Sequence, residues 1–177
     1  MTDSAQPARA LEQELFDEWP DAVRALFDGT GLREKTGFTA SLVSVDANGH
    51  VRTSLLGIGE LYAPDSRTVC IALWPQARAT RVLTQSRRAA LTFVFDDAFY
   101  QVQLEFEALP SQGDTTGRAG LACFAGSIDT GEAQRVRYAR LTCGITFELQ
   151  EDNEAVLERW EQQIEHLKRA AQSAAKR

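Results

Sequence analysis

Alternating apolar and polar residues from Phe38 to Leu109 constrain this chain more than any other feature of its sequence. Phe38–Val45 is rich in β-forming residues, and Val51–Leu55 returns with a period of two after the turn residues Asn48 and Gly49. Asn and Gly both tolerate positive φ, which a tight hairpin turn requires. The stretch therefore predicts a hairpin of antiparallel strands.

Three more strands are predicted from the same pattern. Thr68–Leu73 is apolar enough to be buried on both faces, as a strand in a barrel wall would be. Ala89–Phe95 and Tyr100–Leu109 alternate with a period of two on either side of a turn. Between the first and second of these strands, a spacing near 3.6 residues predicts a short helix that starts near Pro75. Its first backbone N–H groups, together with Arg78, form a candidate phosphate site.

Composition limits the class of protein. The chain has 177 residues, of which 44% are apolar and 25% charged, and these values are typical of one folded domain with a hydrophobic core. A net charge of −6 argues against nucleic-acid binding, which depends on a basic surface. No apolar run is long enough to cross a membrane. The first residues lack the basic start and apolar stretch of a secretory signal, so we expect a cytoplasmic protein.

Helical patterns flank the predicted sheet. Near the N-terminus, Leu11, Leu15 and Trp19 form one helical stripe, Pro20 interrupts it, and a second stripe continues to Phe27. We therefore expect two short helices to lead into the sheet. At the other end of the chain, a helix-start signal precedes a long apolar seam. The seam consists of Leu157, Trp160, Ile164, Leu167 and Ala171.

The seam has two candidate partners. Its spacing suits packing on its own sheet or on a second subunit, so a structural dimer built on this helix is one hypothesis.

The segment before this helix is predicted to contain a polar loop after Leu109, a helix at Arg118–Ala125 and a last strand at Tyr138–Gln150. The predicted organisation is one structural domain, with a helical lead-in at 1–34, a sheet domain at 35–150 and a C-terminal helix at 151–177.

Residues for hydrolytic or metal chemistry are scarce in the sequence. His50 and His166 are the only histidines, and neither has Cys, Asp or Glu neighbours at metal-ligand spacing. The three cysteines, Cys70, Cys123 and Cys143, lack any Cys-x-x-Cys spacing and are expected to fill the core. No catalytic acid or base and no metal site can be named. If the protein is an enzyme, its reactive atoms belong to a cofactor.

Three local motifs resemble the pyridoxamine 5′-phosphate oxidase-like family of flavin-binding split barrels. The hairpin from Thr39 to Ser54 resembles the family's first hairpin, whose second strand begins with an Arg that contacts the flavin phosphate, and Arg52 occupies that position. Leu73–Leu83 followed by Arg88–Phe93 resembles the family's unit of strand, short helix and strand. A later strand resembles the one whose Gln reaches the flavin, and Gln101 occupies that position.

The resemblance implies a fold that is mainly β with flanking helices, a six-stranded antiparallel split β-barrel, and a homodimer that binds FMN near the subunit interface. In the implied phosphate site, Arg78 matches the family's Arg, whereas Ala77 and Ala79 replace its usual Ser and Lys. Arg81 is a further candidate donor one helical step away. The predicted cofactor-binding residues are Arg52, Thr53, Ser54, Ala72, Leu73, Trp74, Arg78, Arg81 and Gln101.

The implied function is that of an FMN-dependent oxidoreductase acting on an unidentified small molecule. Ala77 and Ala79 leave open a non-catalytic module that binds another planar cofactor, such as a deazaflavin or haem, or none. The Arg-x-His with which the oxidase proper binds its substrate phosphate has no match, so oxidase activity on that vitamer is not expected. A basic cluster of Arg135, Arg137 and Arg140 is interpreted either as a contact for an anionic ligand or as solvated surface.

Overall fold

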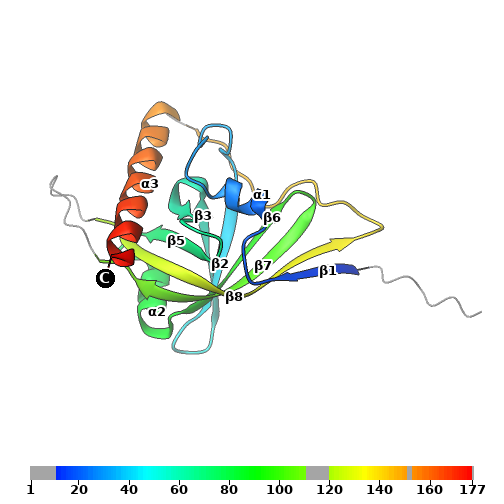
Figure 1. Cartoon of the computed structure of the whole chain (residues 1–177), viewed down its shortest axis with the longest axis horizontal. Coiled ribbons are helices and arrows are strands. Elements are labelled where there is room, and N and C mark those ends of the chain that lie inside the picture. Colours follow the sequence, from blue (N-terminus) through cyan, green and yellow to red (C-terminus); the bar gives the residue numbers. More distant parts are fainter. Residues whose placement is uncertain (1–10, 111–119, 151–152, 177) are drawn as a thin grey trace, which may run out of the picture.

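Antiparallel strands form the body of the molecule, and helices lie at one end of it and along its side (Figure 1). The structure is a computed structural model, and it describes residues 11–110, 120–150 and 153–176. The elements in chain order are β1 (Leu11–Phe16), α1 (Asp21–Leu26), β2 (Thr39–Val45), β3 (Val51–Gly57), the 3-10 turn η1 (Ile58–Glu60), β4 (Leu61–Tyr62), β5 (Thr68–Leu73), α2 (Arg78–Ser86), β6 (Arg88–Phe95), β7 (Ala98–Ala108), β8 (Ala122–Val136) and α3 (Asn153–Ala175).

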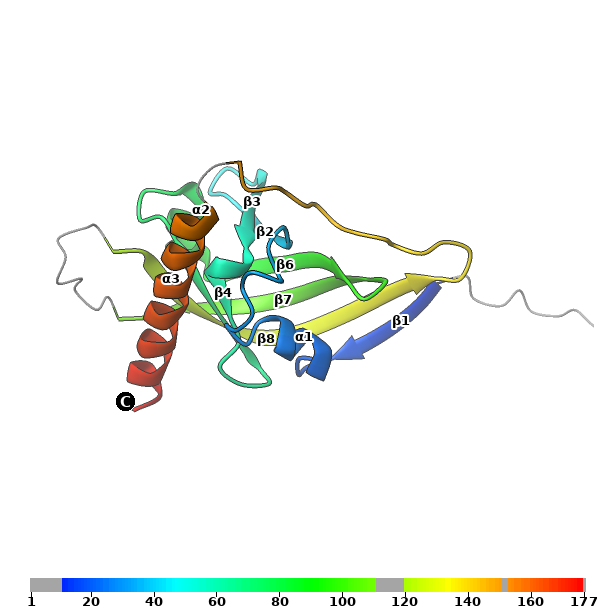
Figure 2. The same ribbon diagram turned by 90° about the horizontal axis from the view of Figure 1, so that it is seen from above.

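The strands form one curled sheet in the order β3-β2-β6-β7-β8-β5-β4, and β1 pairs with β8 beside this path. The class predicted from the sequence, mainly β with flanking helices, is confirmed. The strand number differs, since the sheet of the described residues has eight strands rather than six. Both views show α3 at one end of the sheet and the paired ends of β1 and β8 projecting at the other (Figures 1 and 2).

The predicted hairpin is present as β2 and β3. Val45 pairs with Val51 across a turn in which Gly49 has a φ of +79°, a conformation that favours glycine. The Asp46 carboxylate closes this turn by accepting hydrogen bonds from the backbone N–H groups of Asn48 and His50, at 2.9 and 3.0 Å. The strands predicted at β5, β6 and β7 and the helices at α1, α2 and α3 are likewise confirmed.

The first of the two predicted N-terminal helices was wrong. Leu11–Phe16 is strand β1, which pairs with β8 from Leu11 opposite Val136 to Phe16 opposite Gly131. A spacing of four residues between Leu11 and Leu15 suits a strand as well as a helix, because four is also a multiple of the strand period. Nearly all of β1 is exposed, so strand pairing rather than burial selects its conformation.

Two predictions after β7 were also wrong. The helix predicted at Arg118–Ala125 is strand from Ala122 onward, and its first residues lie outside the described ranges. Part of the loop predicted after Leu109 lies outside them too. The segment predicted as the last strand instead forms an extended strap, residues 137–150, without ladder partners along most of its length. The alternation of its apolar residues suggested a strand, but the described sheet offers it no neighbouring strand.

The apolar seam of α3 packs on its own chain. Leu157, Trp160, Ile164, Leu167 and Ala170 are buried, against η1, β4 and β5. The strap also reaches this core, where Phe147 meets Trp160 edge-to-face with a ring-centroid distance of 6.1 Å. The seam is thus covered within the chain, which removes the hypothesis of a dimer built on it. The division into segments 1–34, 35–150 and 151–177 stays a prediction.

The cysteine prediction was right for two thiols and wrong for the third. Cys70 and Cys123 are buried in the core, whereas Cys143 is exposed on the strap. Burial raises the pKa of Cys70 to about 12 and that of Cys123 to about 11, so both thiols are protonated at neutral pH. No helix among residues 11–110, 120–150 and 153–176 combines the length and the apolar character needed to span a membrane.

Gly59 in η1 allows α3 to approach the sheet, and Gly59→Ala is expected to destabilise the fold. An added Cβ would lie 2.2 Å from Cγ of Trp160, a contact that forces the helix to move. We expect a loss of about 1–3 kcal/mol in the free energy of unfolding by urea titration. Gly120→Ala is the matched control, because its Cβ would meet no atom within 4 Å. Equal stability of the two variants would contradict this account of the packing.

Candidate functional site

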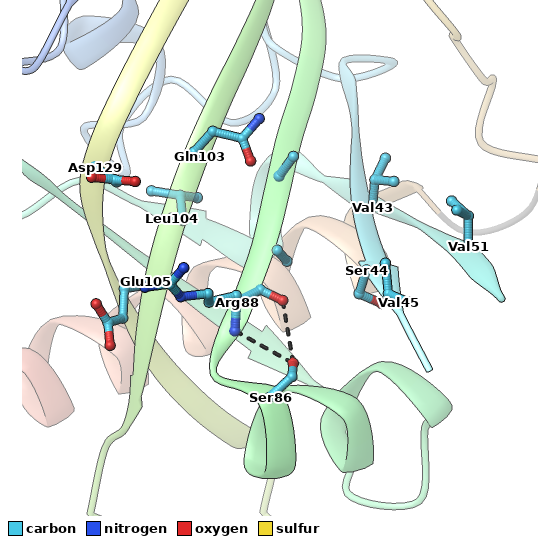
Figure 3. Close-up of a pocket in the computed structure, with 12 residues that line it drawn as sticks. Val43, Ser44, Val45, Val51, Ser86, Arg88, Gln103, Leu104, Glu105 and Asp129 are labelled. Atoms are coloured by element: carbon cyan, nitrogen blue, oxygen red, sulfur yellow. Dashed lines mark hydrogen bonds between the residues drawn. The ribbon is translucent and has the colours of Figure 1, made fainter. Parts of the chain in front are cut away.

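A groove of about 410 Å³ crosses the face of the sheet that points away from the core (Figure 3). We call it the outer-face groove. Its position follows from strand parity, because Val43, Ala90 and Gln103 are register partners on neighbouring strands and share this face. The lining residues are Val43, Ser44, Val45, Val51, Ser86, Arg88, Ala89, Ala90, Gln103, Leu104, Glu105 and Asp129.

The groove has one apolar side and one polar side. Figure 3 shows Val43 and Val51 on one side and Gln103 and Glu105 on the other. Ala90 lies on β6 between them, and its small side chain leaves the middle of the groove open. A cavity with an apolar wall and a few polar groups opposite it suits a small organic molecule that must be held in one orientation.

A β-bulge shapes the polar side. Gln103 pairs with Thr130, but Leu104 pairs with Ile128, so Asp129 on β8 has no direct partner on β7. The register shift places Asp129, Gln103 and Leu104 together on the groove. Bulges of this kind redirect side chains and are frequent beside binding sites. The sequence contains no signal that distinguishes Asp129 from its neighbours, which is why this residue was missed.

Arg88 and Ser86 close one end of the groove. Ser86 is the last residue of α2, and its Oγ lies 3.3 Å from the carbonyl oxygen and 3.4 Å from the backbone nitrogen of Arg88 (Figure 3). Arg88 lies opposite Glu105 in the β6–β7 register. Arg88, Gln103 and Glu105 are polar residues in strands whose apolar and polar residues alternate. Such alternation is consistent with an exposed side chain, but it does not show that the three residues border a hollow.

None of the nine predicted cofactor-binding residues lines the outer-face groove, although two lie on the same face. Thr53 pairs with Val43, and Gln101 lies two residues before Gln103 on β7. Gln101 also pairs with Glu132 of β8, which accepts hydrogen bonds from the side-chain amides of Gln13 and Gln134. Gln101 thus belongs to a polar area beside the groove.

Arg52 and Ser54 point to the opposite side of β3, because they alternate with Thr53. Arg52 is held by its own hairpin, since its Nε donates to Oδ2 of Asp46 at 2.8 Å. This contact, with the backbone hydrogen bonds from His50 and Asn48, lowers the pKa of Asp46 to about 2. One edge of the Arg52 guanidinium is therefore already occupied.

The remaining predicted residues follow one another along β5 and α2. Ala72 and Leu73 are buried in β5 and pair with Cys123 and Ala122 of β8, so they offer only backbone groups. Trp74 directly after them is half exposed, with 52% of its surface accessible. Its carbonyl oxygen accepts a hydrogen bond from the hydroxyl of Thr80 at 2.7 Å, which fixes the entry into α2.

Arg78 and Arg81 are exposed on α2, and neither guanidinium group forms a hydrogen bond or ion pair within the described ranges. The first turn of the helix contains no acidic residue, and Ala77 at its N-cap provides no side-chain acceptor. The partial positive charge of the helix N-terminus is therefore left without a compensating group of the chain. About eight residues of helix separate Arg78 from Ser86 at the groove, roughly 12 Å along the axis.

The structure thus divides the predicted residues into three places: the outer face with Thr53 and Gln101, the hairpin with Arg52, and the start of α2 with Arg78 and Arg81. Among the described residues, no group of three or more His, Cys, Asp or Glu side chains is arranged to hold a metal ion.

We compared the sequence and the fold with those of known proteins. No family model matches the chain. The uncharacterised protein YclD of Bacillus subtilis strain 168 is 31% identical over 150 residues, which cover 84% of this chain and 95% of YclD. A crystal structure of a candidate pyridoxamine 5′-phosphate oxidase from Lactobacillus delbrueckii superposes with a TM-score of 0.50 at 14% identity, over 66% of this chain and 94% of that one.

Two other solved structures match with lower TM-scores. An FMN-binding protein of Syntrophomonas wolfei has a TM-score of 0.45 at 16% identity, over 62% of this chain and 86% of its own. The haem storage protein HutZ of Vibrio cholerae has a TM-score of 0.46 at 11% identity, over 63% and 90%. The fold is that of the pyridoxamine 5′-phosphate oxidase-like split barrels, as the resemblance implied. By sequence, the chain belongs to the family of YclD.

The ion pair at the hairpin predicts a pH dependence of stability. Because the pKa of Asp46 falls from 3.8 to about 2 on folding, the ionised carboxylate stabilises the fold above roughly pH 4, and this contribution is lost as the pH falls toward 2. Asp46→Asn is expected to be less stable than wild type at pH 6, with a difference that shrinks between about pH 4 and pH 2 in urea titrations. Arg52→Ala removes the largest cause and is expected to flatten the wild-type profile. A difference that stays constant with pH contradicts this assignment.

Proposed function

We propose that this protein is an FMN-binding flavoprotein that acts as an oxidoreductase on a small molecule and works as a homodimer. The proposal rests on the outer-face groove, which has an apolar side and a polar side next to Gln101 and ends at the helix that carries the free Arg78 and Arg81. A phosphorylated planar ring needs both of these features: an amphipathic slot and cationic donors within reach of it.

The start of α2 fits the phosphate. Arg78 and Arg81 supply guanidinium groups without competing carboxylates, and the first N–H groups of the helix add partial positive charge. Ala77 and Ala79 remove a hydroxyl and an ammonium that the resemblance led us to expect. Arg52 is not counted among these donors, because it points to the opposite side of β3 and its guanidinium already contacts Asp46 and His50. The proposed phosphate site therefore has fewer side-chain donors than the family pattern, but it retains two arginines.

The outer face fits the ring. Val43, Val45 and Val51 would pack on its apolar part, and Gln101 and Gln103 would provide hydrogen bonds to its polar edge. Bound FMN would supply two-electron transfer, whereas this chain would bind, orient and shield it.

Flavin binding is tested with purified protein. We expect FMN titration to quench flavin fluorescence with a single site per chain, and Arg78→Ala or Arg81→Ala to weaken binding by about tenfold each, because each removes a charge-assisted hydrogen bond. Arg169→Ala is the control, since Arg169 is exposed on α3, which does not line the groove. Unchanged flavin absorbance and fluorescence on mixing wild-type protein with FMN rejects the proposal.

The homodimer is proposed from an apolar strip on the same face. Val45, Val51 and Leu55 share the outer face of β2 and β3, and 52%, 67% and 54% of their respective surfaces are accessible. Val45 and Val51 are register partners, and Leu55 lies on the same face of β3 beyond Thr53. Large apolar side chains exposed at a sheet edge are typical of a surface that a partner covers. We assign a second copy of the chain as the partner. β3 is an edge strand of the sheet, and in a symmetric dimer each copy would cover the β3 edge of the other.

This assignment predicts that charge on the strip separates the subunits. Val51→Glu is expected to shift the protein from dimer to monomer in light scattering, because a carboxylate would be buried without a partner. Leu15→Glu is the control: Leu15 is 74% accessible but lies on β1, away from the strip. A wild-type monomer, or a V51E variant that stays dimeric, contradicts the proposal.

A second candidate function is a binding module for another planar cofactor or for none. It is favoured by Ala77 and Ala79 and by the pairing of Arg52 with Asp46. A thermal-shift series with FMN, a deazaflavin and haem separates the two functions, because a ligand that binds only the folded state raises the melting temperature.

A cytoplasmic location is also part of our proposal, since the three cysteines are unpaired, as is usual in reducing compartments.

A further inference from the structure

A second hollow, of about 410 Å³, lies at the projecting end of the sheet. There the end of β8 meets the beginning of β1 and the turn between β6 and β7, far from α3 (Figure 2). We call it the arginine hollow. Its lining residues are Glu12, Asp97, Arg135, Val136, Arg137, Tyr138, Ala139 and Arg140.

Two turns bring three arginines into this hollow. Val136 forms a bridge with Ala139, so the chain reverses directly after β8 and carries Arg137 and Arg140 back beside Arg135. The opposing turn between β6 and β7 has Asp96 and Asp97 at φ values of +48° and +64°. Asp tolerates this left-handed conformation better than most residues, and the tight turn places Asp97 on the hollow.

The arginines keep most of their hydrogen-bonding capacity. Arg137 contacts Glu12 through Nε at 2.8 Å, and Arg140 approaches Asp97 through Nε at 3.8 Å, which is too long for a hydrogen bond. The terminal nitrogens of Arg137 and Arg140 make no contact with the described part of the chain. Arg135 donates from Nη2 to the carbonyl oxygen of Asp96 at 3.3 Å.

The charges of the hollow do not cancel. The residues that line the hollow include three arginines, Arg135, Arg137 and Arg140, and two carboxylates, Glu12 and Asp97, so the lining by itself carries one excess positive charge in a chain whose net charge is −6. The two carboxylates of the lining pair with Arg137 and Arg140, so these ion pairs do not require Arg135. A ligand with several acceptor oxygens would use it, because guanidinium groups form paired hydrogen bonds with such oxyanions.

We propose that the arginine hollow binds the phosphate group of a phosphate monoester. A phosphate offers three terminal oxygens and up to two negative charges, which match three guanidinium groups better than a single carboxylate does. The site is separate from the proposed flavin site. Asp97 at the hollow and Gln103 at the groove are six positions apart along the chain, roughly 20 Å of extended strand.

Calorimetry with inorganic phosphate, glycerol phosphate and acetate at low ionic strength tests this inference. We expect both phosphates to bind wild-type protein and acetate to bind at least about tenfold more weakly. Arg140→Ala is expected to weaken phosphate binding by about tenfold, as the loss of a charge-assisted donor does. Arg67→Ala is the matched control, since Arg67 has similar exposure and an ion pair with Asp17 at 2.9 Å but lies outside the hollow.

Variants of the two carboxylates give a result that loss of structure cannot imitate. Glu12→Gln and Asp97→Asn free Arg137 and Arg140 from their intramolecular partners, so phosphate binding should strengthen by about two- to fivefold, as expected for an exposed ion pair. Asn is also well suited to the positive φ at position 97. Absence of phosphate binding by wild type, equal binding of acetate, or weaker binding in both carboxylate variants overturns the proposal. FMN titration of the same variants stays unchanged if the two sites are independent.

Discussion

Strand β8 is the element on which the rest of the structure depends, because it pairs with three others. One edge of β8 pairs with β7 along most of its length. The other edge is shared: Ala122–Ser127 pairs with β5, and Gly131–Val136 pairs with β1. The first half therefore closes the curled body of the sheet, and the second half extends from it as an arm. The bulge at Asp129 lies between the halves, where the strand changes partners.

This division separates the surfaces on which the proposals rest. The core face is covered by α3 and by the end of the strap, and Gly59 and Trp160 set how closely the helix approaches. The outer face is only partly covered, since Gly144 of the strap packs near Val94 while Val45, Val51 and Leu55 stay exposed. The groove lies on this uncovered part, and the arginine hollow lies on the arm. The two proposed sites thus lie at different places along β8, the groove at Asp129 and the arginine hollow at Arg135 and Val136.

The candidate site could be read from the sequence only in part. Arg78 and Arg81 were recognised as polar residues of the short helix in a strand, helix and strand unit, and Gln101 as a polar residue of a later strand. The structure has them exposed or half-buried on α2 and β7. The pairing of Arg52 with Asp46 was not foreseen, because it depends on how the side chain of a turn residue folds back on the hairpin. Asp129 and Ser86 were not foreseen either. Their place on the groove depends on a register shift and on where α2 ends against β6.

By itself, the sequence determined the local elements whose period and turn residues agree: the hairpin at Asn48 and Gly49, the strands β5, β6 and β7, and the helices α1, α2 and α3. Only the tertiary structure decided the fate of Leu11–Phe16 and of the strap, since a strand exists only where another strand can pair with it. The same holds for the seam of α3, whose spacing allowed two partners. The sheet within its own chain offered the nearest apolar surface, and burial against it left the outer face as the part of the barrel without a cover.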